Sequence, residues 1–157
     1  MFNNTFEGVF KVFATHNVDF IIVGGYAVNF YGYRRDTGDL DLWVKPSIEN
    51  MNKIMYSLKD LGFDEEELNQ VFPLDLSRPV CFRLGEEPSV IDVFTHMAGV
   101  IYDDADKNKV PYKIDENLNV YFIQYYELVT NKMLSGREKD KVDVDELQKI
   151  TQLIKLK

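Results

Sequence analysis

Two aspartates stand two positions apart in an apolar run, where their spacing could support metal chemistry. Asp39 and Asp41 occur in "GDLDLWV", residues 38–44. Side chains alternate between faces along a strand, so both carboxylates would share one face, about 7 Å apart. Such a pair repels in a low dielectric, and a divalent cation removes the conflict because carboxylate oxygens bind Mg²⁺ well. The alternative is an exposed edge strand with solvated aspartates.

A third carboxylate lies in a second apolar run. Asp92 stands in the middle of "SVIDVFT", residues 89–95, where an unpartnered charge is expensive. A metal shared with the first two aspartates would offset that charge. The alternative partner is an arginine, Arg83 or Arg35, in a salt bridge.

Two adjacent glycines could bring backbone close to a phosphate. Gly24 and Gly25 follow the buried run "VDFIIV" and precede a short helix that we expect from about Tyr26 to Tyr31. Glycines there let N–H groups approach an anion, and a helix N-terminus favours negative charge. The alternative is an ordinary tight turn.

Two basic groups have the chemistry to neutralise phosphate oxygens. Arg34 and Arg35 lie between the glycines and the aspartates. The second group lies in "NKMLSGREKDKVD" and comprises Lys132, Arg137, Lys139 and Lys141. Its alternative is a solvated helix face with Lys–Asp pairs, although Ser135-Gly136 interrupts the helix where a ligand could approach.

The flanking sequence predicts the elements that must position these residues. Helices are expected at about 4–16, 26–31, 47–61 and from 125 onward with a break at 135–136, and strands at 18–23, 39–44, 80–85, 89–95, 112–115 and 119–123. The last helix would bury one face, formed by Val144, Leu147, Ile150 and Ile154. The acidic stretch 64–70 should be exposed. This mixture predicts an α+β or mixed α/β fold, with a short mixed sheet flanked by helices and a C-terminal helical segment.

Size and charge limit the classes of function. The 157 residues suit one domain, with a sheet core at 1–97 and a hairpin and C-terminal helices at 98–157. A net charge of −8 argues against a long nucleic acid as partner, but not against nucleotides. With no evident signal peptide or membrane-spanning run, we expect a cytoplasmic protein. Cys81 is the only cysteine, which excludes an internal disulfide, and we expect a buried thiol.

In their order along the chain, these residues resemble the nucleotidyltransferase superfamily related to DNA polymerase β. Its signature is Gly-Gly or Gly-Ser, about a dozen residues, and then Asp-x-Asp flanked by apolar residues, with a third carboxylate on a later strand. Here thirteen residues separate Gly25 from Asp39, and Asp92 fits the third carboxylate.

The finer resemblance is to the minimal nucleotidyltransferases and the AbiEii-type toxins. These groups often carry "GG-x-A" and "R-x-[ST]-x-D-[ILF]-D", matched here by "GGYA" and by "RDTGDLD" from Arg35 to Asp41. They also tend to end with a lysine and "R-x-K-D-x-x-D", matched by Lys132 and "REKDKVD". Tyr26 stands where the toxins often have threonine, which leaves the subfamily open.

The resemblance implies transfer of a nucleoside monophosphate (NMP) from a nucleoside triphosphate (NTP) to an acceptor hydroxyl, with release of pyrophosphate. It implies two Mg²⁺ ions, with Mn²⁺ as a substitute. Asp39 and Asp41 would bridge the metals, while Asp92 would hold the catalytic one and help deprotonate the acceptor. The implied nucleotide-binding residues are Gly24, Gly25, Arg35, Thr37, Lys132, Arg137, Lys139 and Asp140, with Thr37 orienting the aspartate strand.

The acidic composition favours a protein or small-molecule acceptor, and transfer to a tRNA end stays open. The resemblance suggests a toxin–antitoxin or phage-defence setting. Because the chain has little room for an acceptor domain, we expect a partner protein or a second copy to complete that site. Two rival interpretations are a catalytically silent regulator that binds nucleotide or a partner, and an interaction module without a ligand.

Overall fold

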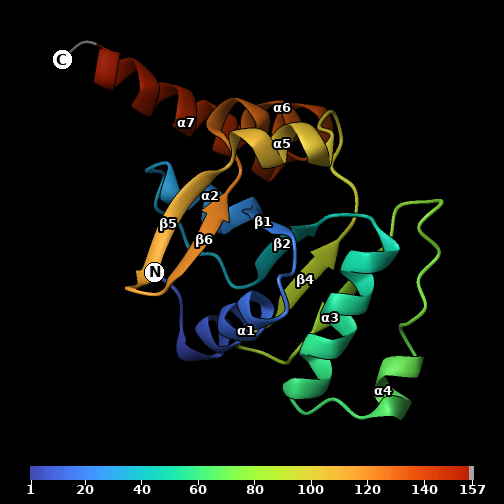
Figure 1. Ribbon diagram of the computed structural model, residues 1–157. Helices are drawn as coiled ribbons and strands as arrows, with labels where there is room; N and C mark the ends of the chain where they lie inside the picture. Colours follow the sequence, from blue (N-terminus) through green and yellow to red (C-terminus); the bar gives the residue numbers. More distant parts are fainter. Residues whose placement is uncertain (156–157) are drawn as a thin grey trace.

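The computed structural model describes the backbone of residues 1–155 and the side chains of residues 1–152. The strands form one six-stranded mixed sheet, and the helices lie around it (Figure 1). The helices are α1 (Asn4–Thr15), α2 (Gly24–Phe30), α3 (Ile48–Asp60), α4 (Glu65–Asn69), α5 (Tyr102–Asn108), α6 (Tyr125–Ser135) and α7 (Glu138–Lys155). The strands are β1 (Phe20–Val23), β2 (Leu40–Val44), β3 (Cys81–Leu84), β4 (Ile91–Phe94), β5 (Val110–Asp115) and β6 (Leu118–Phe122). The predicted fold class is confirmed.

The strand order is β3-β4-β2-β1-β6-β5. Neighbours are antiparallel in the pairs β1–β2, β3–β4 and β5–β6, and parallel in the pairs β2–β4 and β1–β6. β2 therefore lies inside the sheet, between β4 and β1. The interpretation of its aspartates as solvated residues on an edge strand is wrong, because both edges of β2 are paired.

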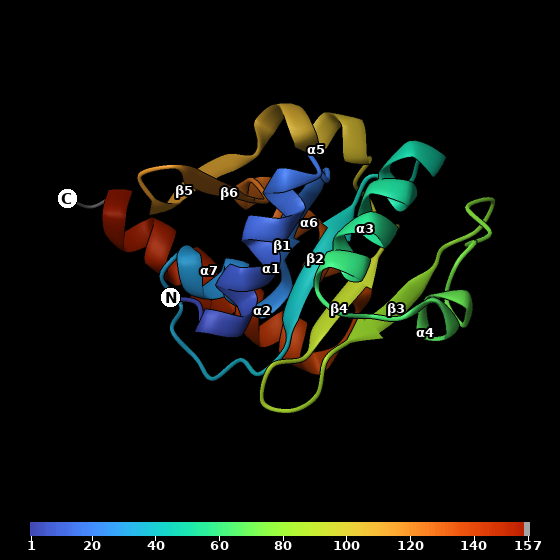
Figure 2. The same cartoon turned by 60° about the horizontal axis from the view of Figure 1, so that its bottom comes forward.

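Helices α1 and α3 cover one face of the sheet (Figure 2). Phe6, Phe10 and Phe13 recur at helical spacing and are fully buried. Phe10 stacks on Phe20 of β1 at 5.8 Å between ring centroids, and Phe20 is the register partner of Val44 in β2. Each such buried side chain contributes roughly 1.5–3 kcal/mol to stability. The apolar side of β2 thus faces the core, as its alternation predicts.

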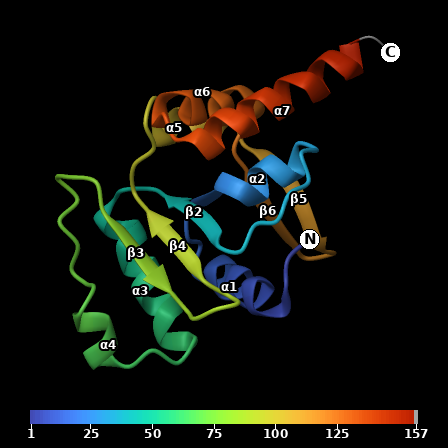
Figure 3. The ribbon, with the colours of Figure 1, turned by 180° about the vertical axis from the view of Figure 1, so that it is seen from behind.

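The opposite face is divided between a packed part and a polar part. Trp43 of β2 packs edge-on against Tyr102 of α5, with ring centroids 5.1 Å apart, and is buried. Two residues earlier in β2, Asp41 lies on the same face as Trp43 and is only half-buried. Seen from behind, α2 lies across the strands and α6 and α7 lie beyond one end of the sheet (Figure 3).

Local sequence accounts for several helix boundaries. Side chains of Asn3 and Ser47 cap α1 and α3 by accepting hydrogen bonds from backbone N–H groups. Gly136 ends α6 with φ of 71°, which confirms the predicted break between α6 and α7. The helix expected from Tyr26 instead begins at Gly24.

Several predictions differ from the structure. Cys81 is exposed, not buried. It lies in β3, an edge strand that has a neighbouring strand on one side only. Helices α4 and α5 were not predicted, since each is short and has few apolar positions; α4 is held by an Asp64–Glu67 capping box over buried Leu68. In α7, Val144 and Leu147 are buried as predicted, but Ile150 is only half-buried, and the Ile154 side chain lies outside the described residues.

Asn50 ties the start of α3 to two strands. Its side-chain amide accepts a hydrogen bond from the Asp19 N–H at 2.8 Å and donates to the carbonyls of Asp19 and Lys45 at 2.9 and 3.1 Å. We predict that Asn50→Ala lowers the free energy of unfolding by about 2–4 kcal/mol, because buried partners lose their bonds. Urea denaturation measures the loss. Asn52→Ala, exposed on the same helix, should change stability little; equal losses in both variants would contradict this role.

Candidate active site

Sheet register places three charged residues of the candidate site in one row. Asp41 of β2 is the register partner of Asp92 in β4, and Asp92 is in turn opposite Arg83 of β3. Register partners in a sheet point to the same face. Asp39 lies two residues before Asp41, at the entrance to β2. The predicted gathering of the first two aspartates near the third thus follows from the parallel pairing of β2 with β4.

Arg83 binds two of these carboxylates. Its Nε donates to Asp92 Oδ1 at 2.9 Å, and its Nη2 donates to Asp92 Oδ2 at 3.3 Å and to Asp39 Oδ2 at 3.5 Å. The salt bridge that the sequence left open for Asp92 is therefore present. Among the described side chains, no three acidic, histidine or cysteine groups are already drawn together around one point that could hold a metal ion.

Burial and neighbouring carboxylates disfavour ionisation of Asp41. Burial, followed by the nearby charge of Asp92, raises its pKa to about 6, and Asp39 adds to the rise. The ammonium group of Lys139 acts in the opposite direction. A group that is costly to ionise beside two other carboxylates is one whose charge a bound cation would compensate.

The glycine pair makes room for side chains as well as for backbone approach. A Cβ on Gly24 would lie 2.0 Å from Asp41 Oδ2, and Gly24 has a φ of +64°, which glycine adopts most easily. A Cβ on Gly25 would lie 2.2 Å from Thr37 Oγ1. The Asp41 carboxylate and the loop before β2 can therefore pack against α2 only because both positions lack a side chain.

A pocket of about 680 Å³ opens over this row of charges. Ten of the eleven predicted site residues line it: Gly24, Gly25, Arg35, Thr37, Asp39, Asp41, Asp92, Lys132, Arg137 and Lys139. Asp140 is fully buried behind it. The lining also includes residues that the site prediction missed, among them Arg83, Cys81, Phe94, His96 and Asn131. Only Arg83 had a signal in the sequence, as the alternative partner of Asp92.

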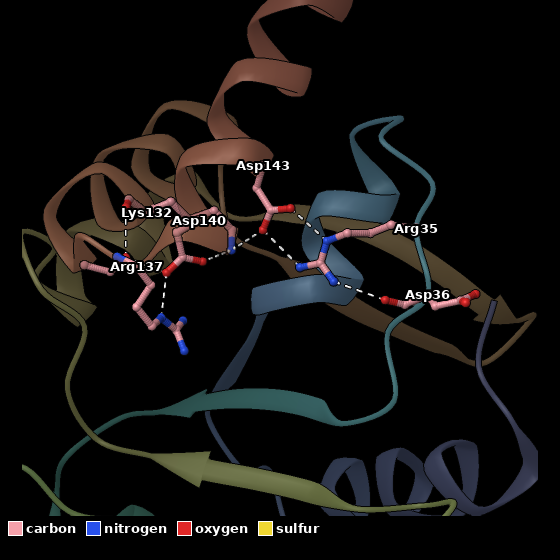
Figure 4. A network of polar contacts seen from close by, with 7 residues as sticks. Arg35, Asp36, Lys132, Arg137, Asp140 and Asp143 are labelled. Carbon is pink, nitrogen blue, oxygen red and sulfur yellow. Dashed lines mark hydrogen bonds and ion pairs between the residues drawn. The ribbon is translucent and has the colours of Figure 1, made fainter.

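Buried ion pairs join α6 and α7 to the loop after α2, and they include Arg35 and Lys132 of the pocket lining (Figure 4). Lys132 Nζ lies 2.9 Å from Asp140 Oδ1 and 3.0 Å from Asp143 Oδ2. Arg35 donates twice to Asp143, at 2.8 and 3.0 Å. Lys132 is 4% exposed, and the two aspartates are 0% and 1% exposed. The positive charges of Lys132 and Arg35 are thus already matched by carboxylates inside the protein.

Hydrogen bonds keep the two buried aspartates ionised. Burial alone would raise the pKa of Asp140, but bonds from Ser135, Lys132 and Arg137 outweigh it and lower the pKa to about 2. The pKa of Asp143 is also lowered, since bonds from Arg35 and Lys132 outweigh its burial. Lys139, in contrast, is exposed at the pocket.

One family model matches residues 3–156, nearly the whole chain, and its description is "Nucleotidyltransferase of unknown function (DUF6036)". The chain belongs to this family. No curated protein matches the chain at a significant level. DUF6036 membership confirms the resemblance to nucleotidyltransferases; it does not select the AbiEii-type or minimal subgroup. In the part of this DUF6036 protein that the structure describes, no helix is long and apolar enough to cross a membrane.

The buried ion pairs predict a large effect of removing their central cation. Lys132→Met should lower the free energy of unfolding by about 3–5 kcal/mol, because it leaves two buried carboxylates without a shared partner. Chemical denaturation at pH 7 measures the change. The matched control is Lys141→Met, since Lys141 is 61% exposed in its pair with Glu138. A Lys132 variant as stable as the control would show that the network does not support the fold.

The raised pKa of Asp41 predicts a pH-dependent gain in stability. Its folded-state pKa of about 6 lies above the ordinary value of 3.8, so ionised Asp41 destabilises the fold above pH 6 and that cost disappears as pH falls toward 4. Asp41→Asn should therefore be more stable than the parent by up to about 3 kcal/mol at pH 7.5 in EDTA, and equal to it near pH 4.

Urea denaturation at both pH values measures this difference. Asp36→Asn removes an exposed carboxylate from the neighbouring loop and serves as the control, with little expected change. A constant difference between Asp41→Asn and the parent across this pH range would contradict the assigned environment of Asp41.

Proposed function

We propose that this DUF6036 protein transfers NMP from an NTP to an acceptor hydroxyl in a metal-dependent reaction that releases pyrophosphate. The observation that carries the proposal is the register of β2 and β4, which sets Asp41 opposite Asp92 under a pocket lined by Lys139 and Arg137. Carboxylates at the base and cations at the rim are the two charge types that an NTP–metal complex requires.

The donor set fits a hard divalent ion such as Mg²⁺ or Mn²⁺. Carboxylate oxygens of Asp39, Asp41 and Asp92 would hold it, and two ions are expected for this chemistry. A cation, the Arg83 guanidinium, already lies between Asp92 and Asp39, which supports a preference for positive charge at this point. When bound, such ions stabilise charge on the phosphate being transferred and on the attacking oxygen.

The other residues of the pocket have distinct proposed tasks. Asp92 would accept the proton of the acceptor hydroxyl, while backbone N–H groups at Gly24 and Gly25 would bind phosphate oxygens. Lys139 and Arg137 would neutralise the phosphate tail, since both are exposed at the pocket.

Because of their burial and contacts, we propose different roles for the four remaining predicted nucleotide-binding residues. Arg35, Lys132 and Asp140 would act through their network, by holding α7 and its Lys139 in place. Thr37 would keep the loop before β2 seated on α2, because its hydroxyl lies where a side chain at position 25 would be.

Charge, size and the motif resemblance support a proposal for the acceptor and the biological setting. The net charge of −8 supports a protein or small-molecule acceptor over a long RNA, with a tRNA end as the other option. We propose that a partner protein or a second copy completes the acceptor site, and that the activity serves a toxin–antitoxin or phage-defence system, as the motif resemblance suggests.

Incubation with each labelled NTP, Mg²⁺ or Mn²⁺ and a host lysate tests the activity. We expect one class of acceptor to take up label, and Asp39→Asn or Asp92→Asn to lower the rate by about a hundredfold or more. Transfer at the parental rate by either variant would overturn the metal assignment. Binding of Mg–NTP without any transfer would instead support the catalytically silent regulator.

A further inference from the structure

We propose that Arg83 is a built-in competitor of the divalent metal: its guanidinium holds Asp92 and Asp39 together and gives up these contacts as an ion binds. The inference rests on the proposed function, because it concerns the same carboxylates. It adds a residue that neither the motifs nor the family description assigns to the site.

The position of Arg83 follows from the sheet. β3 is an edge strand, and its antiparallel register with β4 sets Arg83 directly opposite Asp92, on the face that carries the aspartates. The guanidinium donates to both oxygens of Asp92, and one of the same nitrogens reaches Asp39. A planar guanidinium suits this two-point contact with a carboxylate. Two of the three proposed metal ligands are thus bound to one cation of the protein itself.

The guanidinium and a metal ion compete for the lone pairs and the space around these oxygens. Mg²⁺ binds carboxylate oxygen at about 2.0–2.1 Å and prefers octahedral geometry, which an adjacent guanidinium on the same oxygens would obstruct. The two cations would also repel each other at short range. Binding of an ion to Asp92 and Asp39 therefore favours displacement of the Arg83 side chain.

Arg83 is placed to move, unlike the second arginine near the site. The Arg83 side chain is 60% exposed, and its partners Asp39 and Asp92 are 33% and 20% exposed. Ion pairs this open to solvent contribute little stability and exchange readily. Arg35 is 23% exposed, and its partner Asp143 is 1% exposed. The structure thus separates an exposed, displaceable arginine in the pocket lining from one that is held by a buried carboxylate.

The change in metal affinity on removal of Arg83 distinguishes competition from a structural role. If Arg83 competes with the metal, its removal strengthens metal binding, because the carboxylates become available and a positive charge disappears. If Arg83 instead serves to hold the carboxylates in their binding positions, its removal weakens metal binding. Both roles predict some loss of stability in EDTA, so stability alone does not decide.

Titration of Mn²⁺ into the full chain without nucleotide, followed by electron paramagnetic resonance and calorimetry, measures the affinity directly. We expect Arg83→Ala to lower the Kd for Mn²⁺ roughly three- to twentyfold, as the loss of two exposed pairs implies, and Arg83→Lys to lie between Arg83→Ala and the parent. Mn²⁺ should raise the melting temperature of Arg83→Ala more than that of the parent. Arg78→Ala is the matched control, because Arg78 is 77% exposed and pairs only with Asp75 in the salt bridges of the described residues; its affinity should equal that of the parent.

The same titration in Asp92→Asn variants distinguishes failure of the competition proposal from failure of the proposed metal site. Unchanged or weaker Mn²⁺ binding in Arg83→Ala, with binding abolished by Asp92→Asn, would overturn the competition and leave the proposed metal site standing. Absence of Mn²⁺ binding in the parent, Arg83→Ala and Arg78→Ala alike would overturn both. Tighter binding in Arg83→Ala that disappears in the Arg83→Ala/Asp92→Asn double variant would establish the competition.

Discussion

The parallel pairing of β2 with β4 brings two like charges to adjacent positions, and much of the molecule is arranged around that pair. Repulsion between Asp41 and Asp92 is unfavourable, and burial makes it more so. Cations approach from several elements: Arg83 from the edge strand, Lys139 from α7 and Lys132 from α6. A fold built only for stability would have little reason to keep these carboxylates together, which is why the row of charges is the strongest structural support for a site.

Two kinds of ion pair hold the pocket, and they differ in strength for a physical reason. The pairs among Lys132, Asp140, Asp143 and Arg35 are shielded from water, so breaking one leaves a buried charge and is costly. Arg83 lies in solvent, where its pairs contribute little and are screened by salt. The buried pairs fix the relation between the C-terminal helices and the loop after α2. The exposed pairs leave the carboxylates open to exchange.

Much of the fold could be predicted from the chain because periodicity reports burial directly. The alternation in "DLDLWV" and the phenylalanine spacing in α1 each correspond to an element with its apolar side inward. α4 and α5 escaped prediction because each is too short for an apolar stripe; α4 is defined by its capping box, whereas α5 has no side-chain cap. Cys81 was placed wrongly because apolar neighbours in the sequence do not reveal that a strand lies at the edge of a sheet.

For the site, residue types and their order along the chain selected ten residues that line the pocket. They did not show which charged residues pair with one another. Lys132 and Asp140 were taken for nucleotide ligands, yet they bind each other, because position in a motif does not show whether a charge faces solvent or a partner eight residues away. Arg83 was named as one of two partners for Asp92, and only the register of β3 could choose between them.

The β2–β4 pairing also has a consequence for the folding of the chain. Fifty residues lie between Asp41 and Asp92, and α3, α4 and β3 occupy that interval. Closing so long a loop costs entropy and slows folding. During synthesis on the ribosome, Asp41 emerges well before Asp92, so a nascent chain can bury β1, β2 and α3 without the repulsion from Asp92. The charged row can form only after Asp92 has been synthesised and β4 has paired with β2.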